Sequence, residues 1–159
     1  MLCRQWFAAT SVSLLIELCV THGTYAQDRQ VYLVNGWRHL SDQNYVEAIK
    51  DSTLCIQKFA GGVLKEQENI SKHETEPPTG GMDQHSSQAM AIFKHGVLND
   101  VAACYFILAQ SQDASNNCPE AKKAYQLLSQ LKYARIWDPQ GWFWNPSEKA
   151  TEWLEDKKC

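Results

Sequence analysis

The chain has 159 residues, enough for one domain or for one domain that follows a targeting segment. Hydrophobic residues make up 44% of it, so a globular core can form. The formal net charge is −3, and neither sign of charge forms a long run. Because binding to phosphates needs clustered Lys and Arg, this composition excludes nucleic acid as the expected partner.

The first 26 residues have the pattern of an export signal. Arg4 precedes an apolar stretch from Trp6 to Val20, and the segment Thr24-Tyr25-Ala26 has a small residue at both positions that a signal peptidase inspects. We therefore expect a signal peptide at 1–26 and a periplasmic or secreted mature protein. The apolar stretch is short for a spanning helix, so no spanning segment is expected after cleavage. The alternatives are an uncleaved anchor and a cytosolic N-terminal helix.

From residue 27 onward, apolar residues recur at helical spacing, which predicts a single all-α domain at 27–159. About six helices stacked as antiparallel hairpins are expected. The first four expected helices cover 31–39, 45–59, 63–72 and 87–112. The last of these is apolar around most of its circumference and is expected to be central. Between the third and fourth, a loop at about 73–86 is predicted from its Pro and Gly pairs.

Two further helices are predicted near the C-terminus. Asn117 is positioned to cap the fifth helix, with Pro119 in its first turn, and Asn145 is positioned to cap the sixth. Between them, Asp138-Pro139-Gln140-Gly141 has the residue pattern of a type I turn. The segment at about 137–159 contains Trp137, Trp142, Trp144 and Trp153, four of the six tryptophans. It is expected to form an aromatic-rich cap on the helical stack.

Four cysteines remain after residue 26, namely Cys55, Cys104, Cys118 and Cys159. An even number in an oxidising compartment permits two disulfides with three possible pairings. For Cys55 and Cys104, burial as small apolar residues is the alternative. Cys118 at the start of a helix has two interpretations: a disulfide, with Cys159 as one partner, or a thiolate stabilised by the helix dipole.

Two of the expected hairpins have small and large residues at recurring positions: Tyr32, Gly36 and Ala48 in the first hairpin, and Tyr105, Leu108, Ala109, Ala121, Tyr125 and Leu128 in the second. Small residues at such positions let two helices approach closely, and aromatic residues fill the neighbouring space. Over about 31–133 this pattern resembles the tetratricopeptide repeat, a helical pair of about 34 residues with fixed large and small positions. The run at 133–144 also resembles the ending of small exported bacterial repeat proteins without an assigned role.

The resemblance implies a function in binding a protein or peptide. Such proteins present a concave surface made by the first helix of each pair, and on it Asn35, Arg38, Asn99 and Gln112 are predicted contacts. The tryptophans suggest a second possibility, in which Trp142 and Trp144 contact a ligand. A small envelope enzyme or binding protein that acts on polysaccharide, with Asp138 and Glu148 as nearby acids, is the alternative function.

No motif for catalysis, phosphate binding or metal binding is found, so we expect no enzyme activity, no cofactor and no metal. Acidic and histidine residues do gather around the predicted loop, but flexible ligands rarely make a tight site. They are interpreted as a solvated loop: His73, Glu74, Glu76, Asp83 and His85.

Overall fold

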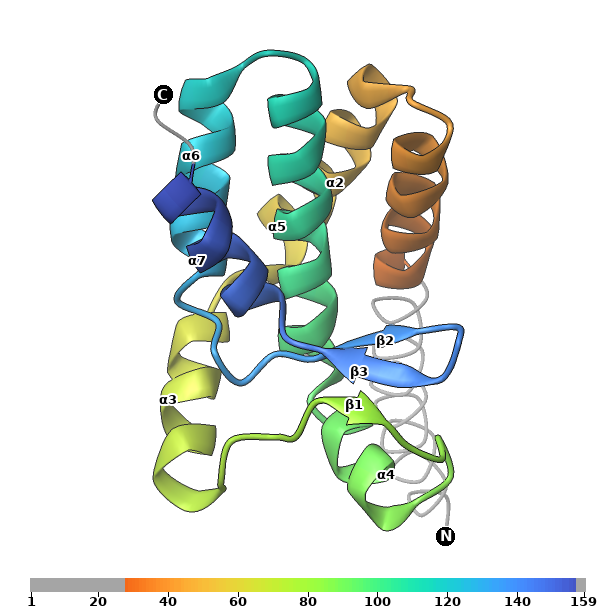
Figure 1. The fold of residues 1–159 in the computed structure, drawn as a ribbon, viewed down its shortest axis with the longest axis vertical. Helices are drawn as coiled ribbons and strands as arrows, with labels where there is room; N and C mark the ends of the chain where they lie inside the picture. Colours follow the sequence, from red (N-terminus) through yellow and green to blue (C-terminus); the bar gives the residue numbers. More distant parts are fainter. Residues whose placement is uncertain (1–27, 157–159) are drawn as a thin grey trace, which may run out of the picture.

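The computed structural model describes residues 28–156, which form an all-α fold of seven helices with one small sheet (Figure 1). The signal peptide predicted at 1–26 and Cys159 lie outside these residues. Among the described residues no single helix is long and apolar enough to cross a membrane. The helices α4, Ser87–Phe93, and α5, Gly96–Ala114, are together long and apolar enough, but they are bent by 68° at the break between them.

A helix at 28–41 and α2, Tyr45–Phe59, form the first hairpin (Figure 1). The observed bounds of α2 are those predicted from its apolar stripe. The helix at 28–41 extends beyond the predicted 31–39 at both ends. Gly36 permits a close approach between this helix and α5, because a Cβ placed there would lie 3.2 Å from Cδ1 of Ile107. The absence of a side chain at Gly36 therefore sets the distance between the two helices.

The central helix is α5, Gly96–Ala114, which packs against α2 on one side and α6, Cys118–Leu128, on the other (Figure 1). A disulfide between Cys55 and Cys104 joins α2 to α5. Small residues fill the fully buried contacts of these helices: Ala48, Ala102, Ala109 and Ala121. The predicted central position is confirmed.

The predicted helix at 87–112 is wrong in one respect, because the chain bends between α4, Ser87–Phe93, and α5. In a continuous helix, the N–H of Gly96 would donate to the carbonyl of Ile92. Instead the side-chain amide of Asn99 donates to that carbonyl at 2.9 Å, and so does the backbone N–H of His95 at 3.2 Å. Asn99 thus satisfies the carbonyl that the bend would otherwise leave without a helical partner.

No strand was predicted, but a three-stranded antiparallel sheet packs beside α4 and the start of α5 (Figure 1). Its order is β1, Gly80–Gly81, then β3, Trp142–Trp144, then β2, Ile136–Asp138. β1 lies in the predicted loop. The expected turn at Asp138 is confirmed, since the N–H of Gly141 donates to its carbonyl at 2.9 Å, and this turn joins β2 to β3.

The remaining helices are α3, Val63–His73, which was predicted to within one residue, and α7, Pro146–Asp156. The predicted cap at Asn145 is confirmed, because Oδ1 of Asn145 accepts a hydrogen bond from the backbone N–H of Ser147 at 3.0 Å. The side-chain cap expected from Asn117 is absent in the described residues, where its amide donates to Gln112 instead. The ring of Trp153 on α7 stacks on Tyr125 of α6 with 4.4 Å between centroids.

Candidate functional site

A groove of about 350 Å³ lies between the helix at 28–41, the start of α5 and strand β2. Four elements contribute to it because α4 and β2 both approach the N-terminal end of α5. The residues that line the groove are Arg29, Gln30, Leu33, Trp37, Phe93, Gly96, Asn99, Asp100, Ala103, Arg135, Ile136 and Trp137. We call this set the aromatic groove.

Three aromatic side chains give the groove its apolar walls, each from a different element. Trp37 comes from the helix at 28–41, Phe93 from the end of α4, and Trp137 from β2. The rings of Phe93 and Trp137 contact each other edge to face, with centroids 6.0 Å apart, and Trp37 packs against Phe106 of α5. Phe93 keeps 39% of its surface exposed. These rings are therefore held by neighbours while part of the apolar surface remains accessible.

An ion pair lies in the groove wall. Nε of Arg29 donates to Oδ2 of Asp100 at 2.6 Å, and both side chains are largely buried. Burial raises the pKa of Asp100, and the hydrogen bond and charge of Arg29 lower it by less. The net direction is upward, so one guanidinium does not fully offset the cost of removing this carboxylate from water.

The floor of the groove is held together by Asn99 and Arg135. Oδ1 of Asn99 accepts a hydrogen bond from the backbone N–H of Arg135 at 2.9 Å, which ties β2 to α5. Arg135 is 2% exposed, and its guanidinium donates to the carboxylate of Glu76 and to four backbone carbonyls. These carbonyls belong to Pro77, Pro78, Lys132 and Ala134.

The four contacts predicted for the concave surface lie in different environments. Asn99 lines the aromatic groove, but its amide already bonds to Ile92 and Arg135. Arg38 is exposed and donates to Oδ1 of Asn35 at 3.3 Å. Gln112 lies at the other end of α5 and accepts a hydrogen bond from Asn117. The structure therefore does not bring these four residues together in one site.

The groove residues that were not predicted have a signal in the sequence. Arg29, Leu33 and Trp37 follow one another at four-residue steps, which places them on one face of a helix. Gly96, Asp100 and Ala103 share a face of α5 in the same way. Periodicity alone could have identified each face, but it could not show that the two faces oppose each other.

The tryptophans predicted to contact a ligand are partly used in packing. Trp144 is half-buried, and its ring lies 4.9 Å from that of Phe106. Trp142 keeps 37% of its surface exposed at the end of the sheet. Phe143 between them is buried against Trp137 and Phe93. Of these two tryptophans, Trp142 is the more accessible to a ligand.

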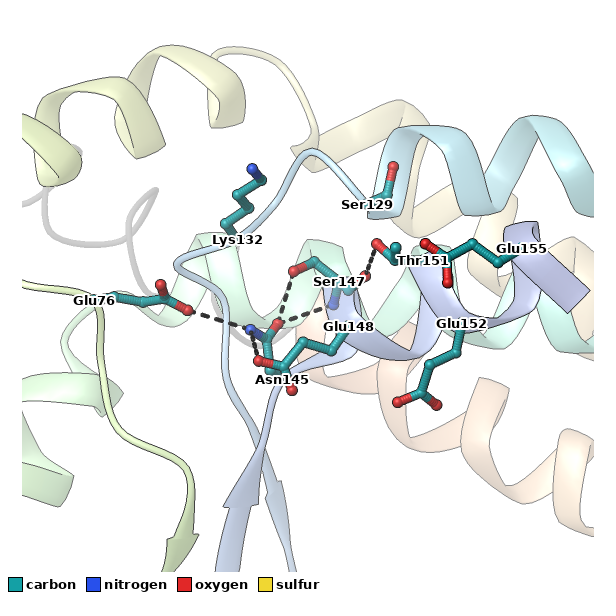
Figure 2. Close-up of a pocket in the computed structure, with 9 residues that line it drawn as sticks. All are labelled: Glu76, Ser129, Lys132, Asn145, Ser147, Glu148, Thr151, Glu152 and Glu155. Carbon is teal, nitrogen blue, oxygen red and sulfur yellow. Dashed lines mark hydrogen bonds between the residues drawn. The ribbon is translucent and has the colours of Figure 1, made fainter.

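A second, acidic pocket of about 440 Å³ opens beside α7 (Figure 2). Figure 2 shows the amide of Asn145 between the carboxylates of Glu76 and Glu148, to which it donates at 3.4 and 3.2 Å. One amide group therefore bridges the two carboxylates. The described residues that line it include no aromatic side chain. They are Glu76, Ser129, Lys132, Asn145, Ser147, Glu148, Thr151, Glu152 and Glu155.

The acidic residues of the segment at about 73–86 have separate partners. The carboxylate of Glu74 bonds to Nε2 of His95 at 3.0 Å and to Lys94. Both hydrogen bonds lower the pKa of Glu74, and the one with His95 lowers it more. Glu76 pairs with Arg135, and Asp83 accepts a hydrogen bond from the backbone N–H of His85. No group of three or more His, Cys, Asp or Glu residues suited to a metal ion is found within 28–156.

The thiolate predicted as one possibility for Cys118 is wrong, because Cys118 is disulfide-bonded. Cys55 and Cys104 are paired with each other, so their interpretation as unpaired apolar residues is also wrong. Cys159, the partner suggested for Cys118, lies outside the described residues. Disulfides fit an oxidising compartment.

Comparisons with known proteins find no matching family model, and neither a curated protein nor a solved structure matches the chain.

Proposed function

We propose that this protein is an exported binding module of tetratricopeptide type, which holds a segment of a partner protein in the aromatic groove. The observation that carries the proposal is the groove itself, about 350 Å³ in volume and lined from four elements. Its volume is within the range of small-ligand sites and suits a few side chains of a peptide. Accessible aromatic side chains supply large contact area at a low cost in conformational entropy.

The position of the groove supports a binding role of this kind. In the tetratricopeptide arrangement, the helix at 28–41 and α5 are the first helices of the two pairs, and their facing sides form the binding surface. The groove lies between these helices. Its walls come from Leu33 and Trp37 on one helix and from Asn99 and Ala103 on the other.

Export is the second part of the proposal. It is supported by the signal pattern at 1–26 and by the buried disulfide between Cys55 and Cys104. The polysaccharide alternative has less support, because the pocket that contains Glu148 has no aromatic residue in its described lining. Asp138 is absent from that lining, so the two acids suggested for this activity do not share the pocket.

Affinity capture from the envelope or secreted fraction of the native host, with two matched variants, tests the proposal. Leu33→Glu places a carboxylate in the groove. Val34→Glu places one on the next residue of the same helix, which is 60% exposed and does not line the groove. We expect wild type and Val34→Glu to capture the same protein, and Leu33→Glu to lose it while keeping its helical circular dichroism.

Capture that is equal for all three proteins, or no specific capture by wild type, would contradict the proposal. A photo-crosslinking amino acid at Gln30, which lines the groove, gives a direct check. The crosslinked partner should be the captured protein.

A further inference from the structure

Part of the aromatic groove surrounds the guanidinium of Arg29, and we call this part the socket. The guanidinium of Arg29 bonds to Asp100 at 2.6 Å and lies 6.0 Å from the ring centroid of Phe59 on α2. It also passes over Gly96, where a Cβ would lie 3.7 Å from its terminal nitrogen. A carboxylate, an aromatic ring and a glycine from two different helices thus surround one guanidinium, which is an arrangement that binds such groups well.

The carboxylate of the socket has capacity for a further donor. Asp100 accepts hydrogen bonds from Arg29 and, at 3.5 Å, from the amide of Gln30. A carboxylate has about four acceptor positions, so the two bonds supplied within 28–156, one of them long, leave acceptor positions open. The upward direction of its pKa agrees with this, since burial outweighs the contribution of Arg29.

The open volume of the groove continues from this ion pair, because Arg29 and Asp100 both line it. Beyond them the groove has apolar residues, among them Leu33, Trp37 and Trp137, and one further charge, the guanidinium of Arg135, which is paired with Glu76. A long side chain that enters here would lay its methylene groups along these apolar residues and direct its charged end to Asp100. Arginine fits that description best, because its planar guanidinium can bond to a carboxylate through two N–H groups.

We infer that the partner segment bound in the groove presents an arginine, which bonds to Asp100 in exchange with Arg29. This inference rests on the proposed function, in which the groove binds a protein segment, and it names the residue that the groove selects. Arg29 then acts as a built-in competitor. Its displacement would remove an ion pair that joins the helix at 28–41 to α5, so binding and the position of this helix are coupled.

The test uses a capped Gly-Arg-Gly peptide and the same peptide with neutral citrulline in place of arginine. Because Trp37 and Trp137 line the groove, their fluorescence reports binding. Arg29→Ala removes the competitor, and we expect it to bind the arginine peptide about tenfold more tightly than wild type. Asp100→Asn in the same background should abolish the gain, and the citrulline peptide should bind weakly to all variants.

Arg38→Ala is the matched control, since Arg38 is on the same helix but is exposed and outside the groove. It should bind like wild type. If circular dichroism shows that Arg29→Ala is unfolded, Arg29→Gln replaces it, because glutamine keeps most of the side-chain length without the charge. Equal binding of the arginine and citrulline peptides, or a gain that survives Asp100→Asn, would overturn the inference.

The two proposals fail in different ways. If Leu33→Glu does not affect partner capture but the arginine peptide binds through Asp100, the socket stands and the proposed function fails. If capture depends on the groove but the peptide does not depend on Asp100, only the choice of arginine is wrong.

Discussion

Two regions of the molecule are held together by different means. The helical layer consists of the helix at 28–41, α2, α5 and α6, and it packs through small apolar residues and the disulfide of Cys55 and Cys104. The sheet region consists of β1, β2, β3, α4 and the segment 74–79. Its elements share a smaller apolar cluster around Phe143 and are joined in addition by buried polar side chains, chiefly Arg135, Asn99 and Asn145.

The difference follows from the length of the elements. A helix of 15 residues such as α2 satisfies most of its own backbone and presents a long apolar stripe. Strands of two or three residues bury little apolar surface and leave many backbone groups without strand partners. Side chains must supply those partners, so single polar residues should matter more in the sheet region than in the helical layer.

The largest effect is expected from the disulfide in the helical layer. Replacing both cysteines, Cys55→Ala with Cys104→Ala, opens a loop of 49 residues and should lower the free energy of unfolding by about 4 kcal/mol. Guanidinium unfolding followed by circular dichroism measures this. A loss below about 1 kcal/mol would mean that helix packing alone holds the layer.

In the sheet region, Arg135→Met should have the largest effect. It removes the donors for four backbone carbonyls and for Glu76, and we expect a loss of about 3 kcal/mol. Hydrogen exchange should show lost protection at 76–82 and 134–144 with α2 still protected. The control is Lys149→Met, whose exposed pair with Glu152 should contribute less than about 0.5 kcal/mol. Equal loss of protection in α2 would mean that the two regions are not separate units.

Asn99 joins the two regions, so its replacement tests the boundary between them. Asn99→Ala removes the bonds to Ile92 and Arg135 and should cost about 2 kcal/mol. Gln112→Ala removes an exposed amide bond from the same helix and should cost less than about 0.5 kcal/mol. Urea unfolding of both variants gives the comparison. Similar values for the two would contradict a joining role for Asn99.

The sequence predicts the two regions unequally well. The bounds of α2 follow from an apolar stripe that ends before Gly61-Gly62, and those of α3 follow from these glycines and from the polar loop that comes after it. The bend between α4 and α5 was missed because apolar residues lie on both sides of Lys94-His95-Gly96, and the side-chain hydrogen bond that accommodates the bend comes from Asn99, seven residues beyond Ile92. The sheet was missed because β1 is two glycines, and its pairing with β3 depends on a distant segment.

The candidate site is subject to the same limit. Asn99 was predicted as a contact and does line the groove. Arg29 and Asp100, which supply its charges, are 71 residues apart, and periodicity gives no information on such a pair. The sequence could predict which residues share a face of each helix. It could not predict which of these faces pack against each other.

A pair of buried serines sharpens the comparison within the helical layer. Oγ of Ser111 is buried and has no hydrogen-bond partner among the described residues, whereas Oγ of Ser52 donates to the carbonyl of Ala48 at 2.6 Å. Ser111→Ala should therefore raise the free energy of unfolding by up to about 1 kcal/mol, and Ser52→Ala should lower it by about as much. Thermal unfolding distinguishes the two. A clear loss for Ser111→Ala would show that its hydroxyl has a partner after all.

The smallest effect concerns charge in the helical layer. Among the described residues, Asp100 has one short hydrogen bond, from Arg29, and burial raises the pKa of Asp100 above the ordinary value. Between the ordinary and the raised pKa, the folded state binds more protons than the unfolded state, so stability falls as pH rises through this window. Above it, the cost of the buried carboxylate is fully present.

We therefore expect wild type to lose stability relative to Asp100→Asn as pH increases from about 3 to 7, with the difference constant at the upper end. Unfolding by urea at a series of pH values measures it. A wild type that gains stability relative to Asp100→Asn over this range would mean that Arg29 more than offsets burial. Asp100 would then have no acceptor position in need of a second donor. An arginine of the partner would have no reason to exchange with Arg29.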